Sequence, residues 1–124
     1  MNAVPFSLDA FGGLGECHGL LKDEEAFLSL EFQTQDAVAG ILKSDVKNAR
    51  ISWDDLVSIT LTKGWLGTTW LGVKIVIQTT SLETLKDVPG ATQGRIELSI
   101  ARKDVEEAEY FVDDVVYGRD QAAE

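Results

Sequence analysis

Alternating hydrophobic and polar residues run through most of the first hundred positions. The stretches 56–62 and 71–78 show the alternation most clearly. Successive side chains of a β-strand point to opposite faces, so each stretch predicts a strand with one buried side. The expected inward residues are Val57, Ile59, Leu61, Leu71, Val73, Ile75 and Ile77. The segment between them, 63–69, contains Gly64 and Gly67, which suit a hairpin loop because glycine adopts positive φ at low cost.

The same alternation predicts further strands at 16–21, 26–34, 48–53 and 94–101. The inward residues expected in the last three are Leu28, Leu30, Phe32, Ala49, Ile51, Trp53, Ile96, Leu98 and Ile100. Residues 35–47 leave two alternatives open, because their apolar patch fits either an extension of the sheet or an anchored loop. Ser81 is suited to cap a single helical turn at 81–86, and Pro89-Gly90 is typical of the turn that ends it.

The hydrophobic period changes at Asp104, from that of a strand to that of an α-helix. The apolar stripe contains Val105, Ala108, Phe111, Val112, Val115 and Val116, and the opposite side contains Glu106, Tyr110, Asp113, Asp114 and Tyr117. Asp104 and Glu107 have the spacing of a capping box, and Gly118 is suited to end the helix. The chain is therefore expected to end in one amphipathic helix that packs on the sheet.

The length of 124 residues fits a single domain, since two cores of half that size would each be marginal. We expect its core to span about 15–118, with 1–14 and 119–124 flexible or peripheral. The predicted fold class is mainly β with one α-helix. Six or seven antiparallel strands would curl into a barrel or sandwich, and the C-terminal helix would cap its open corner.

This order of elements resembles the pleckstrin-homology-like (PH-like) fold, including the bacterial PH and GRAM-type domains. The residues that carry the resemblance are the strand, acidic corner and strand at 51–59, ISWDDLVSI, together with the glycine-containing hairpin and the terminal helix. The resemblance implies a mostly non-catalytic module that binds phosphoinositides, peptides or proteins. In that family, basic residues in the loop between the first two strands would bind lipid. The corresponding segment here, 22–25, reads KDEE and is mainly acidic, so phosphoinositide binding is not expected.

The formal net charge of −10 argues against nucleic acid and anionic membranes as partners, because both are bound mainly through lysine and arginine. Basic residues are scattered, and only Arg102 and Lys103 are adjacent. The single cysteine, Cys17, excludes an intramolecular disulfide and suits a reducing compartment. The sequence also lacks an apolar run long enough to span a membrane and the pattern of a signal peptide, so it predicts a cytoplasmic protein.

The residues that could support metal binding or catalysis do not form a recognisable set. Cys17 and His18 are the only cysteine and histidine, and neighbours on a strand point to opposite faces. The acidic pairs 54–55 and 113–114 have no histidine beside them. We therefore expect no catalytic residue, metal or cofactor, and a non-enzyme. A small hydrolase that uses acidic residues is a minor alternative.

Trp65, Leu66 and Trp70 are large apolar residues at the predicted hairpin tip. Leaving them in water is unfavourable, so they are expected to contact a protein, to fold back over the barrel mouth, or to pack against the glycine-rich N-terminal segment. The sequence thus predicts a binding or assembly module that acts through a protein partner or self-association. A β-barrel that binds a small molecule is the alternative.

Overall fold

The structure is a computed structural model, and it describes residues 3–10, 15–24, 27–36, 46–66, 68–86, 88 and 91–123. Its strands are β1 (Ala3–Ala10), β2 (Gly15–Asp23), β3 (Phe27–Asp36), β4 (Lys47–Ser52), β5 (Leu56–Leu66), β6 (Thr69–Thr79) and β7 (Arg95–Ile100). A 3₁₀ turn, η2 (Arg102–Asp104), leads into helix α1 (Val105–Ala123). The prediction of a mainly β fold with one C-terminal helix is confirmed.

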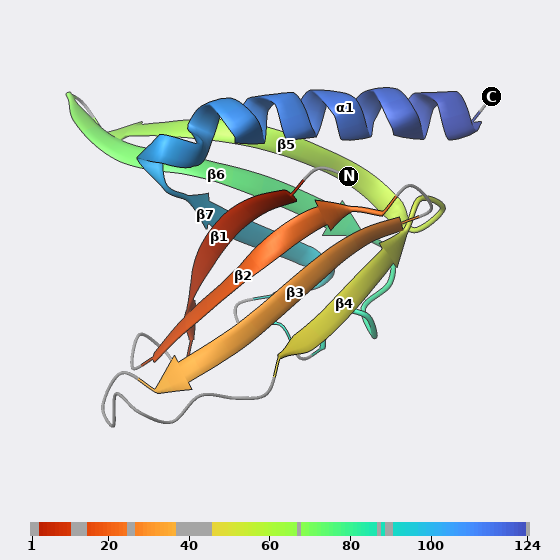
Figure 1. The fold of residues 1–124 in the computed structure, drawn as a ribbon, viewed down its shortest axis with the longest axis horizontal. Coiled ribbons are helices and arrows are strands. Elements are labelled where there is room, and N and C mark those ends of the chain that lie inside the picture. The colour runs from red at the N-terminus through yellow and green to blue at the C-terminus, as the bar shows by residue number, and fades with distance from the viewer. Residues whose placement is uncertain are drawn as a thin grey trace.

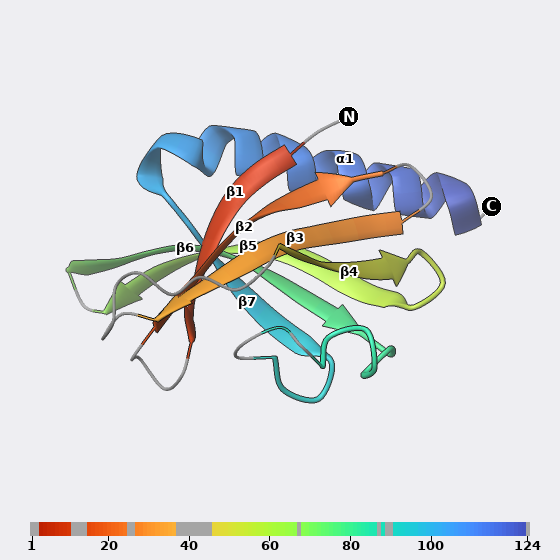
Figure 2. The ribbon, with the colours of Figure 1, turned by 60° about the horizontal axis from the view of Figure 1, so that its bottom comes forward.

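The strands form one antiparallel sheet in the order β4-β3-β2-β1-β7-β6-β5. Within the described residues no pairing joins β4 to β5, so the sheet is not closed. The half formed by β1–β4 and the half formed by β5–β7 run in different directions (Figures 1 and 2). They are joined where Ser7 of β1 lies opposite Ser99 of β7.

The inward side chains of both halves and of α1 form one hydrophobic core. The core side chains that the sequence placed inward and the structure buries are Leu28, Leu30, Phe32, Ala49, Ile51, Ile59, Val73, Ile75, Ile77, Ile96, Leu98, Ile100, Ala108, Phe111, Val112 and Val115. Helix α1 lies alongside β5 and also contacts β1 and β6 (Figure 1). The expectation that its apolar stripe packs on the sheet is confirmed, although Val116 at its margin is 39% exposed.

The first strand corrects, for residues 3–10, the expectation that the segment 1–14 is flexible or peripheral; residues 1–2 and 11–14 lie outside the described residues. β1 lies in the centre of the sheet, between β2 and β7, and Val4 and Phe6 are buried in the core. Pro5 obscures this strand in the sequence, because proline has no N–H to donate to a neighbouring strand and is rare inside sheets. Pro5 lies opposite Leu20 of β2, and the register of β1 with β7 pairs Ser7 with Ser99.

A β-bulge corrects the predicted face of Val57. Leu56 pairs with Thr79 and Ser58 with Gln78, which leaves Val57 as an extra residue on β5. The extra residue shifts the alternation by one position. As a result Leu56 and Ile59 are both buried, while Val57 is 47% exposed.

Two expected local structures also differ. Gly118 does not end the helix, because α1 continues to Ala123. A glycine inside a helix costs only about 1 kcal/mol relative to alanine, and the residues that follow it are compatible with a helix. The expected helical turn at 81–86 is a series of turns, in which Ser81 and Thr84 hydroxyls lie 2.7 Å apart and Leu85 is buried. Of the undecided segment 35–47, β3 includes the first two residues, and 37–45 lies outside the described residues.

Candidate protein-contact site

The tip of the β5–β6 hairpin contains the predicted contact residues Trp65, Leu66 and Trp70. The seven-residue loop expected at 63–69 is wrong, because β5 runs to Leu66 and β6 begins at Thr69. In this register Trp65 lies opposite Trp70, and Leu66 opposite Thr69. Directly opposite residues share a face of the ribbon, so the pairing brings the two tryptophan positions together. Their side chains lie outside the described part of the structure.

A pair of glycines separates this tip from the rest of the hairpin. Gly64 lies opposite Gly72, and the register shifts between Gly64 and Trp65, which leaves Leu71 as an extra residue on β6. Gly72 has φ +101°, a conformation that side-chain-bearing residues rarely adopt. A bulge bends a strand and increases its twist, so this neck sets the direction of the tip.

The hairpin extends beyond the other strands. Figures 1 and 2 both show the ends of β5 and β6 projecting past β7 and past the beginning of α1. The neighbouring strand β7 ends at Ile100, which lies opposite Val73. Among the described residues β6 therefore has no β7 partner on the tip side of Val73, and the tip is a ribbon of β5 and β6.

An ion pair joins the hairpin to α1 just below the neck. Lys63 Nζ lies 2.9 Å from Glu109 Oε1, and each side chain is about half exposed, at 52% and 45%. An exposed ion pair of this kind contributes about 1 kcal/mol at most. The ion pair holds the end of the regular β5–β6 pairing beside the first turns of α1.

The other end of the hairpin is anchored by Asp55 in the acidic corner. Thr79 Oγ1 donates a hydrogen bond to the Asp55 carbonyl (2.9 Å), and Thr80 N–H donates to the same oxygen (2.9 Å). Ser52 Oγ donates to the Asp55 carboxylate (3.1 Å). These contacts give Asp55 a structural role at the corner, next to the exposed Asp54.

Cys17 and His18 point to opposite faces of β2, as predicted: Cys17 is fully buried and His18 is exposed. Burial raises the pKa of the Cys17 thiol to about 11, because an apolar surrounding disfavours the thiolate. Among the residues whose positions the structure gives, no three His, Cys, Asp or Glu side chains are grouped to hold a metal.

The segment 22–25 does not lie between the first two strands, as the comparison with a lipid-binding loop requires. Because β1 precedes it, the segment at 22–25 connects the second and third strands. Lys22 Nζ donates a hydrogen bond to Glu31 Oε2 (2.7 Å), which raises the pKa of Lys22 and engages its charge within the sheet. The residues between β1 and β2, 11–14, read FGGL in the sequence and contain no basic residue.

Two exposed tyrosines are further functional candidates. The helical period predicts their outward position, but the sequence analysis does not name them as site residues. Tyr110 and Tyr117 lie on the outward side of α1 and are 65% and 67% exposed. The signal was present in the sequence, because the two residues are seven positions apart within an acidic stretch.

Comparisons with family models, curated proteins and solved structures found no match to this chain. In the described part of the chain, no helix has the length and apolar character needed to cross a membrane.

Proposed function

We propose that this chain is a non-catalytic binding or assembly module, with a PH-like barrel or sandwich, that acts through protein–protein contacts at the tip of its β5–β6 hairpin. The observation that carries this proposal is the register at the tip, where Trp65 lies opposite Trp70 on a two-stranded ribbon that extends past its neighbours. The succession of antiparallel strands followed by one helix supports the PH-like assignment.

The tip is expected to contact another chain because tryptophan side chains exposed to water carry a free-energy cost. Apolar surface left in water costs about 25 cal/mol per Å², and a buried aromatic side chain removes roughly 150–250 Å² from water. Tryptophan is also among the residues that contribute most to binding at protein interfaces. A contact with another chain at the tip would bury this surface.

Charge narrows the kind of partner. The chain carries −10, so the phosphates of nucleic acid and of anionic lipids would be repelled. Lys22, the one basic residue in the segment 22–25, is hydrogen-bonded to Glu31. A protein surface, or a second copy of this chain, is the partner that agrees with these observations.

The experiment compares the wild type with the double variant Trp65→Ala/Trp70→Ala. Light scattering and sedimentation velocity measure self-association, and affinity capture from the source cell measures the retained partner. The expected result is loss of association or of the retained protein, with the urea midpoint unchanged. Leu82→Ala is the control, because Leu82 is an exposed apolar residue (61%) outside the hairpin.

Two results would contradict the proposal. If the wild type sediments as a monomer and retains no protein, the tip has no partner to contact. If the double variant associates like the wild type and loses thermal stability instead, the tryptophans pack on their own domain.

A further inference from the structure

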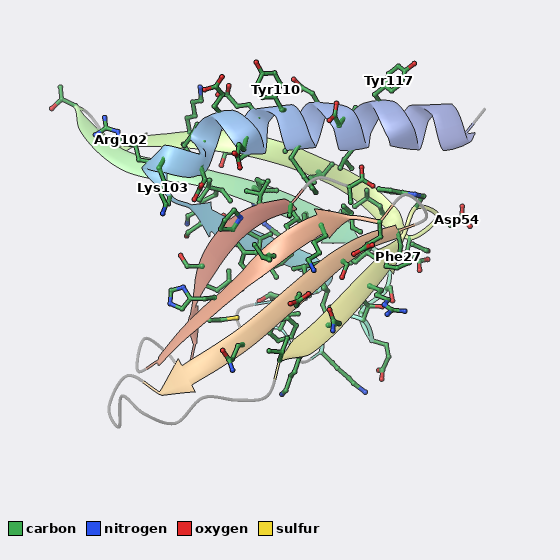
Figure 3. The ribbon with its side chains drawn as sticks, in the orientation of Figure 1. Phe27, Asp54, Arg102, Lys103, Tyr110 and Tyr117 are labelled. Atoms are coloured by element: carbon green, nitrogen blue, oxygen red, sulfur yellow. The ribbon has the colours of Figure 1, made fainter. Side chains whose placement is uncertain are left out.

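The outward side of α1 presents one stripe in which carboxylates and tyrosines alternate: Glu106, Tyr110, Asp113 and Tyr117. At 100° per residue these four positions fall within about 60° of one another around the helix axis. All four side chains are exposed. Figure 3 shows the labelled Tyr110 and Tyr117 pointing away from the sheet, on the same side of the helix.

The packing of the fold does not account for this stripe. The opposite side of α1 supplies Ala108, Phe111, Val112 and Val115 to the core. The stripe instead leaves two phenol rings about two-thirds exposed (65% and 67%), side by side with carboxylates. Positions 105–118 contain five acidic residues and no basic residue, while Arg102 and Lys103 lie in the 3₁₀ turn before α1 and Lys63 pairs with Glu109 outside the stripe.

We propose that this stripe binds an arginine-bearing segment of another protein. A guanidinium group is planar and always charged, so it can stack on a tyrosine ring while it pairs with a neighbouring carboxylate. The alternation of acid and ring along the helix offers that combination twice, at Glu106 with Tyr110 and at Asp113 with Tyr117. Lysine fits less well, because its compact ammonium cannot pair in a bidentate way or stack as a plane.

A second copy of this chain is a poorer occupant of the stripe. Two copies of α1 placed face to face would bring the carboxylates of one stripe against those of the other. Like charges at such contacts oppose association. This surface is separate from the hairpin tip, so the inference goes beyond the proposed function and does not depend on it.

The test measures the affinity of two fluorescent peptides by anisotropy at low ionic strength. One peptide carries four arginines separated by pairs of glycine, and the other carries lysines at the same positions. The wild type is expected to bind the arginine peptide several-fold more tightly than the lysine peptide. The variant Tyr110→Ala/Tyr117→Ala is expected to weaken arginine binding about tenfold and to remove the preference. Tyr110→Phe/Tyr117→Phe keeps the rings and should bind like the wild type.

A charge-matched pair of variants separates a specific site from general attraction to an acidic protein. Glu106→Gln/Asp113→Asn removes two carboxylates from the stripe, and it should weaken both peptides about fivefold. Asp54→Asn/Glu97→Gln removes two exposed carboxylates from the β4–β5 corner and β7, and it should change the affinity by less than about twofold.

Three results would overturn the inference. They are no binding of the arginine peptide to the wild type, equal binding of the two peptides, and equal weakening by the two charge variants. Trp65→Ala/Trp70→Ala should leave peptide binding unchanged, so the inference and the proposed function can fail separately. Urea midpoints within error of the wild type verify that each variant is folded.

Discussion

The base and the tip of the β5–β6 hairpin are built on different principles. In the base, Ile77 of β6 lies between Ile59 of β5 and Ile96 of β7, and all three are buried. Beyond the Gly64–Gly72 neck, β6 has lost its β7 partner and the register has shifted. The base therefore contributes to the core of the domain, while the tip is held by its own two strands.

Because of this difference, the base of the hairpin should govern the stability of the domain, and the tip should govern its association with a partner. Changes in the base should alter the free energy of unfolding, because they create cavities in a close-packed core. Changes in the tip should leave that free energy nearly unchanged and alter association. Two register shifts, at Leu56/Ser58 and at Gly64/Trp65, mark where the regular pairing of the base begins and ends.

The largest expected effect is that of Ile77→Ala in the base. Ile77 is fully buried, so the variant should lose about 2–5 kcal/mol of unfolding free energy through lost transfer energy and a residual cavity. Urea denaturation measures the loss. Val57→Ala is the matched control, because Val57 is a half-exposed residue (47%) at the bulge of the same hairpin and should stay within about 0.5 kcal/mol. Equal losses in the two variants would show that the base is not part of the core.

The second largest expected effect is a loss of unfolding free energy at alkaline pH, caused by the Cys17 thiol, which is buried in the core. The folded state raises the pKa of Cys17 from 9.0 to about 11, so it favours the neutral thiol. Stability from this group is complete below pH 9 and is lost as the pH rises through 11, by about 2–3 kcal/mol. Cys17→Val should remove this component of the pH profile, measured by urea denaturation from pH 8 to pH 11.

The tip double variant Trp65→Ala/Trp70→Ala serves as the comparison for that pH profile. It should keep the Cys17 component, because Cys17 lies on β2, outside the hairpin. A profile that is the same with and without Cys17 would contradict the burial of this thiol.

The smallest expected effect is the difference between two glycine variants, one at the neck of the hairpin and one in the turn before β7, beside the base of β6. Gly94 has φ +80°, and a Cβ added to it would meet the Thr79 carbonyl oxygen at the base of β6. Gly72 at the neck has φ +101°, and an added Cβ would meet no atom of the described residues within 4 Å. Both alanine variants carry backbone strain of about 1–3 kcal/mol, and Gly94→Ala adds a clash with the backbone.

Gly94→Ala should therefore destabilise the protein more than Gly72→Ala, by about 1 kcal/mol or more in urea denaturation. Gly72→Ala should change the direction of the tip, which association measurements would detect. The opposite order of stabilities would show that the neck, and not the base, is the constrained end of the hairpin.

Side-chain periodicity predicted the faces of β3, β4, β6 and β7 and the buried stripe of α1, because burial on one face imposes a period on each element separately. It failed where the neighbouring strand decides the structure. Val57 was expected inward, and the bulge opposite Gln78 and Thr79 turned it outward. The candidate site was predicted in part: the residues at the tip were identified, but their pairing across a short turn was not.

By itself, the sequence determined a mainly β domain with one amphipathic helix, a strongly acidic surface, and a hairpin with tryptophans near its end. The tertiary structure decided that residues 3–10 form a central strand and that Trp65 lies opposite Trp70. The helical period alone predicts Tyr110 and Tyr117 on the outward side of α1, and the structure confirms that both are exposed. The physical reason is that alternation is a local property of one strand, whereas register, bulges and exposure depend on which element lies beside it.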